Sequence, residues 1–155
     1  MSSVFTPQIF YRDPRAAIAW LERAFGFETT LLVTDDAGAV AHAEMGLGLG
    51  RFNIGAELAS NDILGPARMK SPASLDGQGT QFVRVALESG LDAHCATAEA
   101  AGARITQRPE TQFYGSRVYR ALDSEGHVWT FDQPVSEVPL AAMESASGLK
   151  ITRPA

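Results

Sequence analysis

Residues 6–28 read TPQIFYRDPRAAIAWLERAFGFE, and they contain the start of a unit that the chain repeats. Asp13-Pro14 supplies a helix N-cap with proline in the first helical turn. Apolar residues at helical spacing follow, and Gly26 ends the pattern. The stretch therefore predicts a strand followed by a helix.

The residues that begin the helix, end the helix and form a later turn have counterparts further along the chain at a fixed distance. The offset is 76 residues for the helix openings (89−13), for the helix ends (102−26) and for two turn glycines before strands (126−50). A constant offset indicates one supersecondary unit present twice. Each copy predicts the order β-α-β-β-β, because strand-like stretches follow each helix.

The predicted fold class is α+β, with tandem βαβββ modules whose mostly antiparallel sheets curl around a cleft. Each sheet has a helix on one face and leaves the other face toward the hollow. We place the first module at residues 1–57, a linker at 58–78, the second module at 79–133 and a C-terminal tail at 134–155.

Composition excludes several functional classes. The net charge of −5 disfavours non-specific nucleic-acid binding, which needs a basic face. No uncharged stretch is long enough to cross a bilayer, and the N-terminus lacks the pattern of a signal peptide. The single cysteine, Cys95, rules out an internal disulfide and favours a reducing, cytoplasmic location.

Three stretches carry a family resemblance: residues 6–28, AHAEMGLGLGRFNIG at 41–55, and YGSRVYRALDSEGHVWTF at 114–131. Over residues 4–133 the chain resembles the vicinal oxygen chelate superfamily of glyoxalases, bleomycin-resistance proteins and dioxygenases. The resemblance implies the tandem module layout. It also implies a homodimer in which the two subunits complete each other's clefts.

The resemblance also indicates where metal ligands would stand. In the metalloenzymes of the family, four inward positions supply His, Glu or Gln. These positions fall here on Thr6, on Asn53 (or Ile54 if the strict repeat is used), on Phe82 and on Thr130. A divalent ion needs several imidazole or anionic donors. We therefore expect no metal cofactor.

The favoured function is metal-independent binding of a small organic molecule, such as sequestration of a drug or metabolite. Aromatic side chains near the hollow would supply apolar contact, and polar side chains would fix the orientation of the ligand. An arginine pair there suits a carboxylate or phosphate, unless each arginine pairs with an acidic neighbour. The predicted ligand-binding residues are Gln8, Phe10, Arg51, Asn53, Phe82, Arg84, Tyr119 and Thr130.

The main alternative is an enzyme. His42 and Glu44 are two residues apart on a predicted strand and so share a face. Facing inward, they could act as an acid–base pair or hold a displaced metal in a lyase, isomerase or dioxygenase. Facing outward, they are ordinary solvated side chains. A partner-binding module with a vestigial cleft is a third possibility.

The remaining candidates have simpler structural interpretations. We expect His94 to be a solvated helix residue and His127 to shape a turn or strand end. Cys95 is expected to pack as a small core residue, because no base is arranged beside it.

Overall fold

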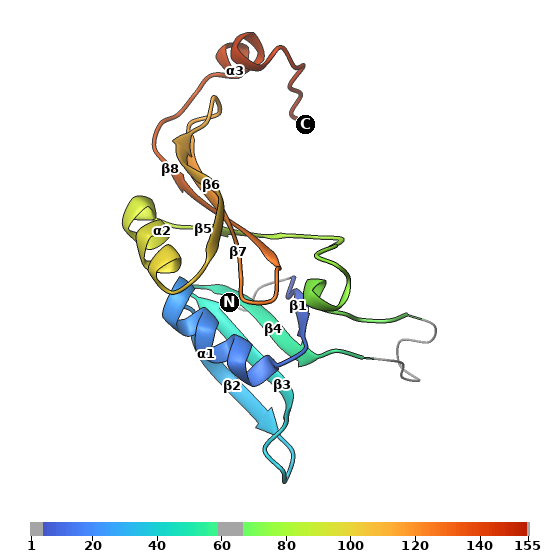
Figure 1. The fold of residues 1–155 in the computed structure, drawn as a ribbon. Coiled ribbons are helices and arrows are strands. Elements are labelled where there is room, and N and C mark those ends of the chain that lie inside the picture. Colours follow the sequence, from blue (N-terminus) through green and yellow to red (C-terminus); the bar gives the residue numbers. More distant parts are fainter. Residues whose placement is uncertain (1–4, 59–66, 155) are drawn as a thin grey trace.

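Two four-stranded sheets, each with a helix packed on one face, form the body of the protein (Figure 1). The structure is a computed structural model that describes residues 5–58 and 67–154. The first module comprises β1 (Gln8–Tyr11), α1 (Pro14–Phe25), β2 (Glu28–Thr34), β3 (Val40–Leu47) and β4 (Gly50–Ala56). The second comprises β5 (Val83–Ala86), α2 (Leu91–Ala100), β6 (Arg104–Thr111), β7 (Ser116–Leu122) and β8 (Val128–Pro134).

The two sheets have the same topology. The strand order is β1-β4-β3-β2 in the first, called sheet 1, and β5-β8-β7-β6 in the second, called sheet 2. In each sheet the first strand pairs in parallel with the fourth, and the other pairs are antiparallel. The predicted tandem βαβββ layout is confirmed, since the strands and helices recur in the same order.

Helix α1 begins and ends where the sequence predicts. The carboxylate of Asp13 accepts a hydrogen bond from the backbone N–H of Ala16, and Pro14 occupies the first turn. Gly26 adopts a left-handed φ of 69° and its N–H donates to the carbonyl of Glu22. Such a cap strongly favours glycine, and the chain can then turn directly into β2.

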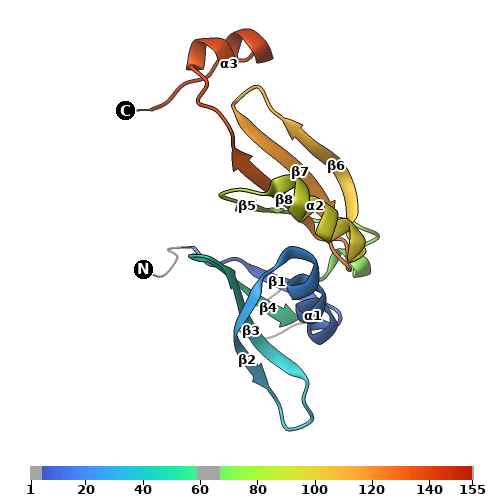
Figure 2. The ribbon, with the colours of Figure 1, turned by 90° about the vertical axis from the view of Figure 1, so that its left-hand side faces the viewer.

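The two modules share one core, which lies against the helix-bearing faces of both sheets. Phe52 of β4 packs on Trp129 of β8 with ring centroids 5.3 Å apart, and Phe25 packs on Phe131 at 4.8 Å. Figure 2 shows the modules stacked with α1 and α2 adjacent. Because the helix-bearing faces meet, the opposite faces of the two sheets, which carry no helix, point away from the shared core. We call them the open faces.

Two segments lie outside the modules. The predicted linker falls partly outside the described residues, and its described part contains a short 3₁₀ helix, η1 (Pro72–Ser74). The tail forms a helix that was not predicted, α3 (Leu140–Ser147), which stands apart from the body (Figure 1). None of the residues of α3 is buried. No helix in the described ranges has the length and apolar character that crossing a membrane requires.

Candidate functional site

The open face of sheet 1 gathers polar side chains from three strands. The register pairs Gln8 with Asn53 and Asn53 with Glu44, so these three side chains form a row across β1, β4 and β3. His42 lies on the same face of β3, and its Nε2 is 3.7 Å from Oε1 of Glu44. His42 and Glu44 therefore lie on the face of sheet 1 that carries no helix, together with Gln8 and Asn53.

The open face of sheet 2 presents a second row. Arg84 of β5 lies beside Thr130 of β8, and Thr130 lies beside Arg120 of β7. Phe82 directly precedes β5 and is 59% exposed. Thr130 is buried, and its Oγ1 forms no hydrogen bond in the described part of the chain.

The register also decides between the two positions that the repeat left open in β4. Asn53 pairs with Gln8 as Thr130 pairs with Arg84 in the other sheet. Ile54 is completely buried and belongs to the core cluster. Asn53, and not Ile54, therefore occupies the open-face position.

Arg84 is fixed by an acidic partner that the sequence analysis did not name. Its Nε and Nη2 each donate to a carboxylate oxygen of Asp132 at 2.7 Å. These hydrogen bonds raise the pKa of Arg84, and the carboxylate compensates its charge. The alternative in which the arginine pairs with an acid is thus realised, with Asp132 as the acid.

Arg51 and Arg84 line one cleft of about 1130 Å³. It opens between the β3–β4 turn and β5, and Phe27, Phe52 and Trp129 contribute to its apolar wall. Nη1 of Arg51 donates to the carbonyls of Gly48 and Gly50, both at 2.7 Å. Gln8 and Phe10 line a smaller hollow of about 440 Å³ beside the linker.

Tyr119 lies on the helix side of sheet 2 and does not line the open face. It is completely buried, and its hydroxyl is 2.6 Å from Nδ1 of His94. Nε2 of the same imidazole is 3.0 Å from the carbonyl of Phe25, which can only accept. The neutral ring therefore donates from Nε2 and accepts the Tyr119 proton at Nδ1.

His94 is therefore a half-buried structural residue and not the solvated helix residue that was expected. Burial lowers the pKa of His94, with the hydrogen bond to Phe25 acting in the opposite direction. Burial also raises the pKa of Tyr119. Cys95 is buried, as predicted, and burial raises its thiol pKa, which disfavours the thiolate.

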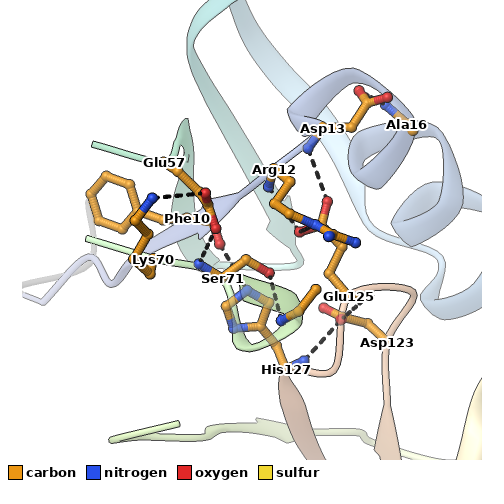
Figure 3. Close-up of polar contacts among 11 residues, drawn as sticks. Phe10, Arg12, Asp13, Ala16, Glu57, Lys70, Ser71, Asp123, Glu125 and His127 are labelled. Carbon is orange, nitrogen blue, oxygen red and sulfur yellow. Dashed lines mark hydrogen bonds and ion pairs between the residues drawn. The ribbon is translucent and has the colours of Figure 1, made fainter. Parts of the chain in front are cut away.

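The turn at residues 123–129, with the pattern Asp-x-x-Gly-His-x-Trp, joins the two modules. Asp123 Oδ2 accepts hydrogen bonds from the Tyr11 hydroxyl at 2.6 Å and from Trp129 Nε1 at 3.0 Å. Figure 3 shows Glu125 accepting the backbone N–H groups of Arg12 and Asp13. It also shows His127, whose Nε2 is 2.9 Å from the Phe10 carbonyl.

Through these hydrogen bonds the polar atoms of the turn have a structural role, which is to hold the two modules together. Burial and the Asp123 carboxylate raise the pKa of Tyr11, so its hydroxyl keeps its proton as a donor. His127 lies directly before β8, where the sequence analysis expected a strand-end residue, and its imidazole also contacts β1.

The donor set does not fit the metal site of the metalloenzymes that the sequence resembles. Thr6, Phe82 and Thr130 offer no imidazole or carboxylate, and Asn53 offers only an amide. Within the described ranges, no group of three or more His, Cys, Asp or Glu side chains could hold an ion. His42 and Glu44 provide two such donors and lack a third.

Sequence reasoning missed Arg120 as an open-face residue and Asp132 as the partner of Arg84. Alternation along β7 and β8 was the available signal for both. Trp129 and Phe131 are core residues, so Thr130 and Asp132 face the other way, and Arg120 lies directly opposite Thr130.

Comparison with known proteins supports the assignment of the fold. TioX from Micromonospora sp. ML1 has a solved structure with a TM-score of 0.66 and 28% identity, covering 88% of this chain and all of that one. A glyoxalase/bleomycin resistance protein/dioxygenase from Nocardioides superposes with a TM-score of 0.62 at 15% identity, covering 88% of this chain and 85% of that one.

A curated relative, the uncharacterized protein Rv0887c of Mycobacterium tuberculosis, is 26% identical over 141 residues, which are 91% of this chain and 80% of the relative. The model of one family matches residues 4–131, which is most of the chain. The chain therefore belongs to the Glyoxalase/Bleomycin resistance protein/Dioxygenase superfamily.

Proposed function

We propose that the protein binds a small organic molecule, without a divalent ion, in a pocket that two copies of the chain form together. The open face of sheet 1 in one copy lies opposite the open face of sheet 2 in the other. One observation carries the proposal: the two faces that hold most of the candidate residues point away from their shared core. A single chain cannot close a pocket between them, whereas a twofold pair closes two.

Both faces have apolar side chains that such a pairing would cover. Leu31 and Val33 of β2 lie opposite Glu44 and His42, and they are 44% and 42% exposed. Phe82 of the other face is also largely exposed. Burying apolar surface of this kind contributes about 25 cal/mol per Å² to association.

The chemistry of the two faces suits binding. Phe10 and Phe82 offer flat apolar contact, and the amides of Gln8 and Asn53 can donate and accept hydrogen bonds. Sequestration of a drug or metabolite requires such contacts and no reactive group. The absence of a third strong ligand beside His42 and Glu44, among the described residues, supports metal-independent binding.

A second candidate function rests on the His42–Glu44 pair. A histidine and a carboxylate 3.7 Å apart on an open face can move a proton to or from a bound molecule. This arrangement favours acid–base chemistry on the same ligand. It predicts that His42→Ala removes turnover and leaves ligand affinity within about threefold, because the remaining contacts still hold the molecule.

A complementation experiment tests the two-copy pocket with the neutral fluorescent dye N-phenyl-1-naphthylamine as the probe. Asn53→Trp blocks the sheet 1 face, and Phe82→Asp removes the aromatic contact of the sheet 2 face. Each variant alone should lose dye binding. Mixing them by unfolding and refolding should restore about a quarter of the wild-type sites, because half of the dimers are mixed and each holds one intact pocket.

Leu149→Asp is the matched control, since it places the same charge on an exposed apolar residue of the tail. It should bind dye as the wild type does. No recovery in the mixture would show that any pocket lies within one chain, such as the cleft beside Arg51, and would reject the proposal. A stoichiometric divalent ion lost on His42→Ala would reject metal independence.

A further inference from the structure

Arg120 carries a positive charge that no carboxylate compensates in the described part of the chain. It is exposed at the centre of β7, and Nη1 donates to Oε1 of Gln107, a neutral acceptor, at 2.7 Å. Arg84, on the same face, is held by both carboxylate oxygens of Asp132. On the open face of sheet 2 the charge of Arg84 is therefore compensated, whereas the charge of Arg120 is available.

Thr130 lies beside Arg120 on the neighbouring strand. The register places it directly between Arg84 and Arg120, in neighbouring strands. Only 4% of the residue is exposed, and its Oγ1 has no hydrogen-bond partner among residues 5–58 and 67–154. Buried hydroxyl groups in folded proteins are nearly always hydrogen-bonded, so an unpartnered one indicates a missing acceptor.

We propose that the molecule bound at this face carries an anionic group, a carboxylate, sulfonate or phosphate, which Arg120 binds and to which the Thr130 hydroxyl donates. This inference rests on the proposed function, because it names the class of ligand for the same pocket. A guanidinium binds such oxyanions through paired N–H donors, and an adjacent hydroxyl supplies a further donor. Arg120 is then a specificity-determining residue, and it is not one of the positions that supply metal ligands in the metalloenzymes of the family.

Two dyes that differ by one charge test the inference. 8-Anilinonaphthalene-1-sulfonate and N-phenyl-1-naphthylamine share a ring skeleton, but only the former carries a sulfonate. Arg120→Gln should weaken binding of the sulfonate dye at least about tenfold, since it removes a charge-assisted contact. The affinity for the neutral dye should stay within about twofold.

Arg23→Gln is the matched control, because Arg23 is an exposed arginine of α1 on the helix side. It removes the same charge and should change neither affinity. Arg120→Lys should recover part of the sulfonate affinity, since an ammonium keeps the charge and loses the paired geometry.

Thr130→Val supplies an independent test with a stability measurement. Because the hydroxyl loses no hydrogen bond to any described residue, the midpoint of unfolding should stay the same or rise, whereas sulfonate affinity should fall about threefold or more. A lower midpoint would show that the hydroxyl is already used within the fold and would remove Thr130 from the site.

The outcomes separate this inference from the proposed function. If both dyes bind and Arg120→Gln affects neither, or affects both equally, the anionic-group inference is overturned while the two-copy pocket stands. If neither dye binds the wild-type protein, the proposed pocket fails first. Loss confined to the sulfonate dye supports both.

Discussion

Replacing Asp123 with asparagine should destabilise the protein more than any exposed charge change. Its Oδ2 accepts two side-chain donors, Tyr11 and Trp129, and its Oδ1 accepts the backbone N–H groups of Glu125 and His127. An amide can keep only one of these oxygens. Whichever oxygen becomes NH₂, at least one donor of this largely buried group is left without an acceptor.

The size of the effect follows from the number of hydrogen bonds that Asp123 accepts. An unsatisfied buried donor costs about 1–3 kcal/mol, and loss of charge assistance weakens the remaining bonds, so we expect about 2–4 kcal/mol in total. In a protein of 155 residues this corresponds to a fall of about 6–12 °C in the unfolding midpoint at 3 kcal/mol. Circular dichroism melts and urea titrations measure both quantities.

Asp36→Asn is the matched control, because Asp36 lies exposed in the β2–β3 hairpin. It should change the free energy of unfolding by less than about 0.5 kcal/mol. Tyr11→Phe removes one donor only and should cost about 1–2 kcal/mol. The double variant should cost less than the sum of its parts, because both changes break the same bond. If Asp123→Asn unfolds at the same temperature as Asp36→Asn, the turn is not what joins the modules.

Two further predictions concern acid and the tail. The pKa of His94 is lowered in the folded state, so at a pH below about 6.5, the ordinary pKa of histidine, the unfolded chain binds more protons than the folded one. The free energy of unfolding should therefore fall as the pH drops below that value. His94→Gln should reduce the slope of the free energy of unfolding against pH. An unchanged slope would show that His94 does not titrate between the two states. Deleting residues 139–155 should change the free energy of unfolding by less than about 0.5 kcal/mol, because no residue of α3 is buried. A loss of several kcal/mol would reveal a surface that covers α3 in solution.

Local pattern was sufficient to predict the modules. Asp13, Pro14 and Gly26 act within a few residues of themselves, through a side-chain cap, a fixed φ and a left-handed turn. The helix-ending glycine recurs 76 residues later as Gly102, whereas α2 begins after Gly90 without a side-chain cap, so its start at Leu91 lies two residues beyond the predicted opening at Ser89. Helix α3 was missed because Pro139 and the small residues around it resemble a loop.

The composition of the candidate site could be predicted only in part. Which side of a strand a residue occupies follows from alternation, and Gln8, Asn53 and Thr130 all lie on the predicted side. Tyr119 was misplaced, although alternation from Phe131, its partner in the ladder, would have put it in the core. The partner of Arg84 could not be read from the sequence, because it lies 48 residues away on the neighbouring strand.

The way in which the modules meet determines where a ligand can bind. Aromatic contacts such as Phe52 with Trp129 join the helix-bearing faces, and the Asp123 turn locks that arrangement with hydrogen bonds to β1. Neither contact is visible in a local pattern, since each joins residues more than 70 positions apart. Because the polar atoms of the turn are engaged in this junction, they are unavailable for chemistry. Arg120, whose charge no carboxylate among the described residues compensates, and the Thr130 hydroxyl lie on the open face of sheet 2, which a second copy encloses in the pocket that we propose. Ligand affinity should therefore depend on protein concentration, and dilution below the dissociation constant of the dimer should abolish dye binding while leaving each chain folded.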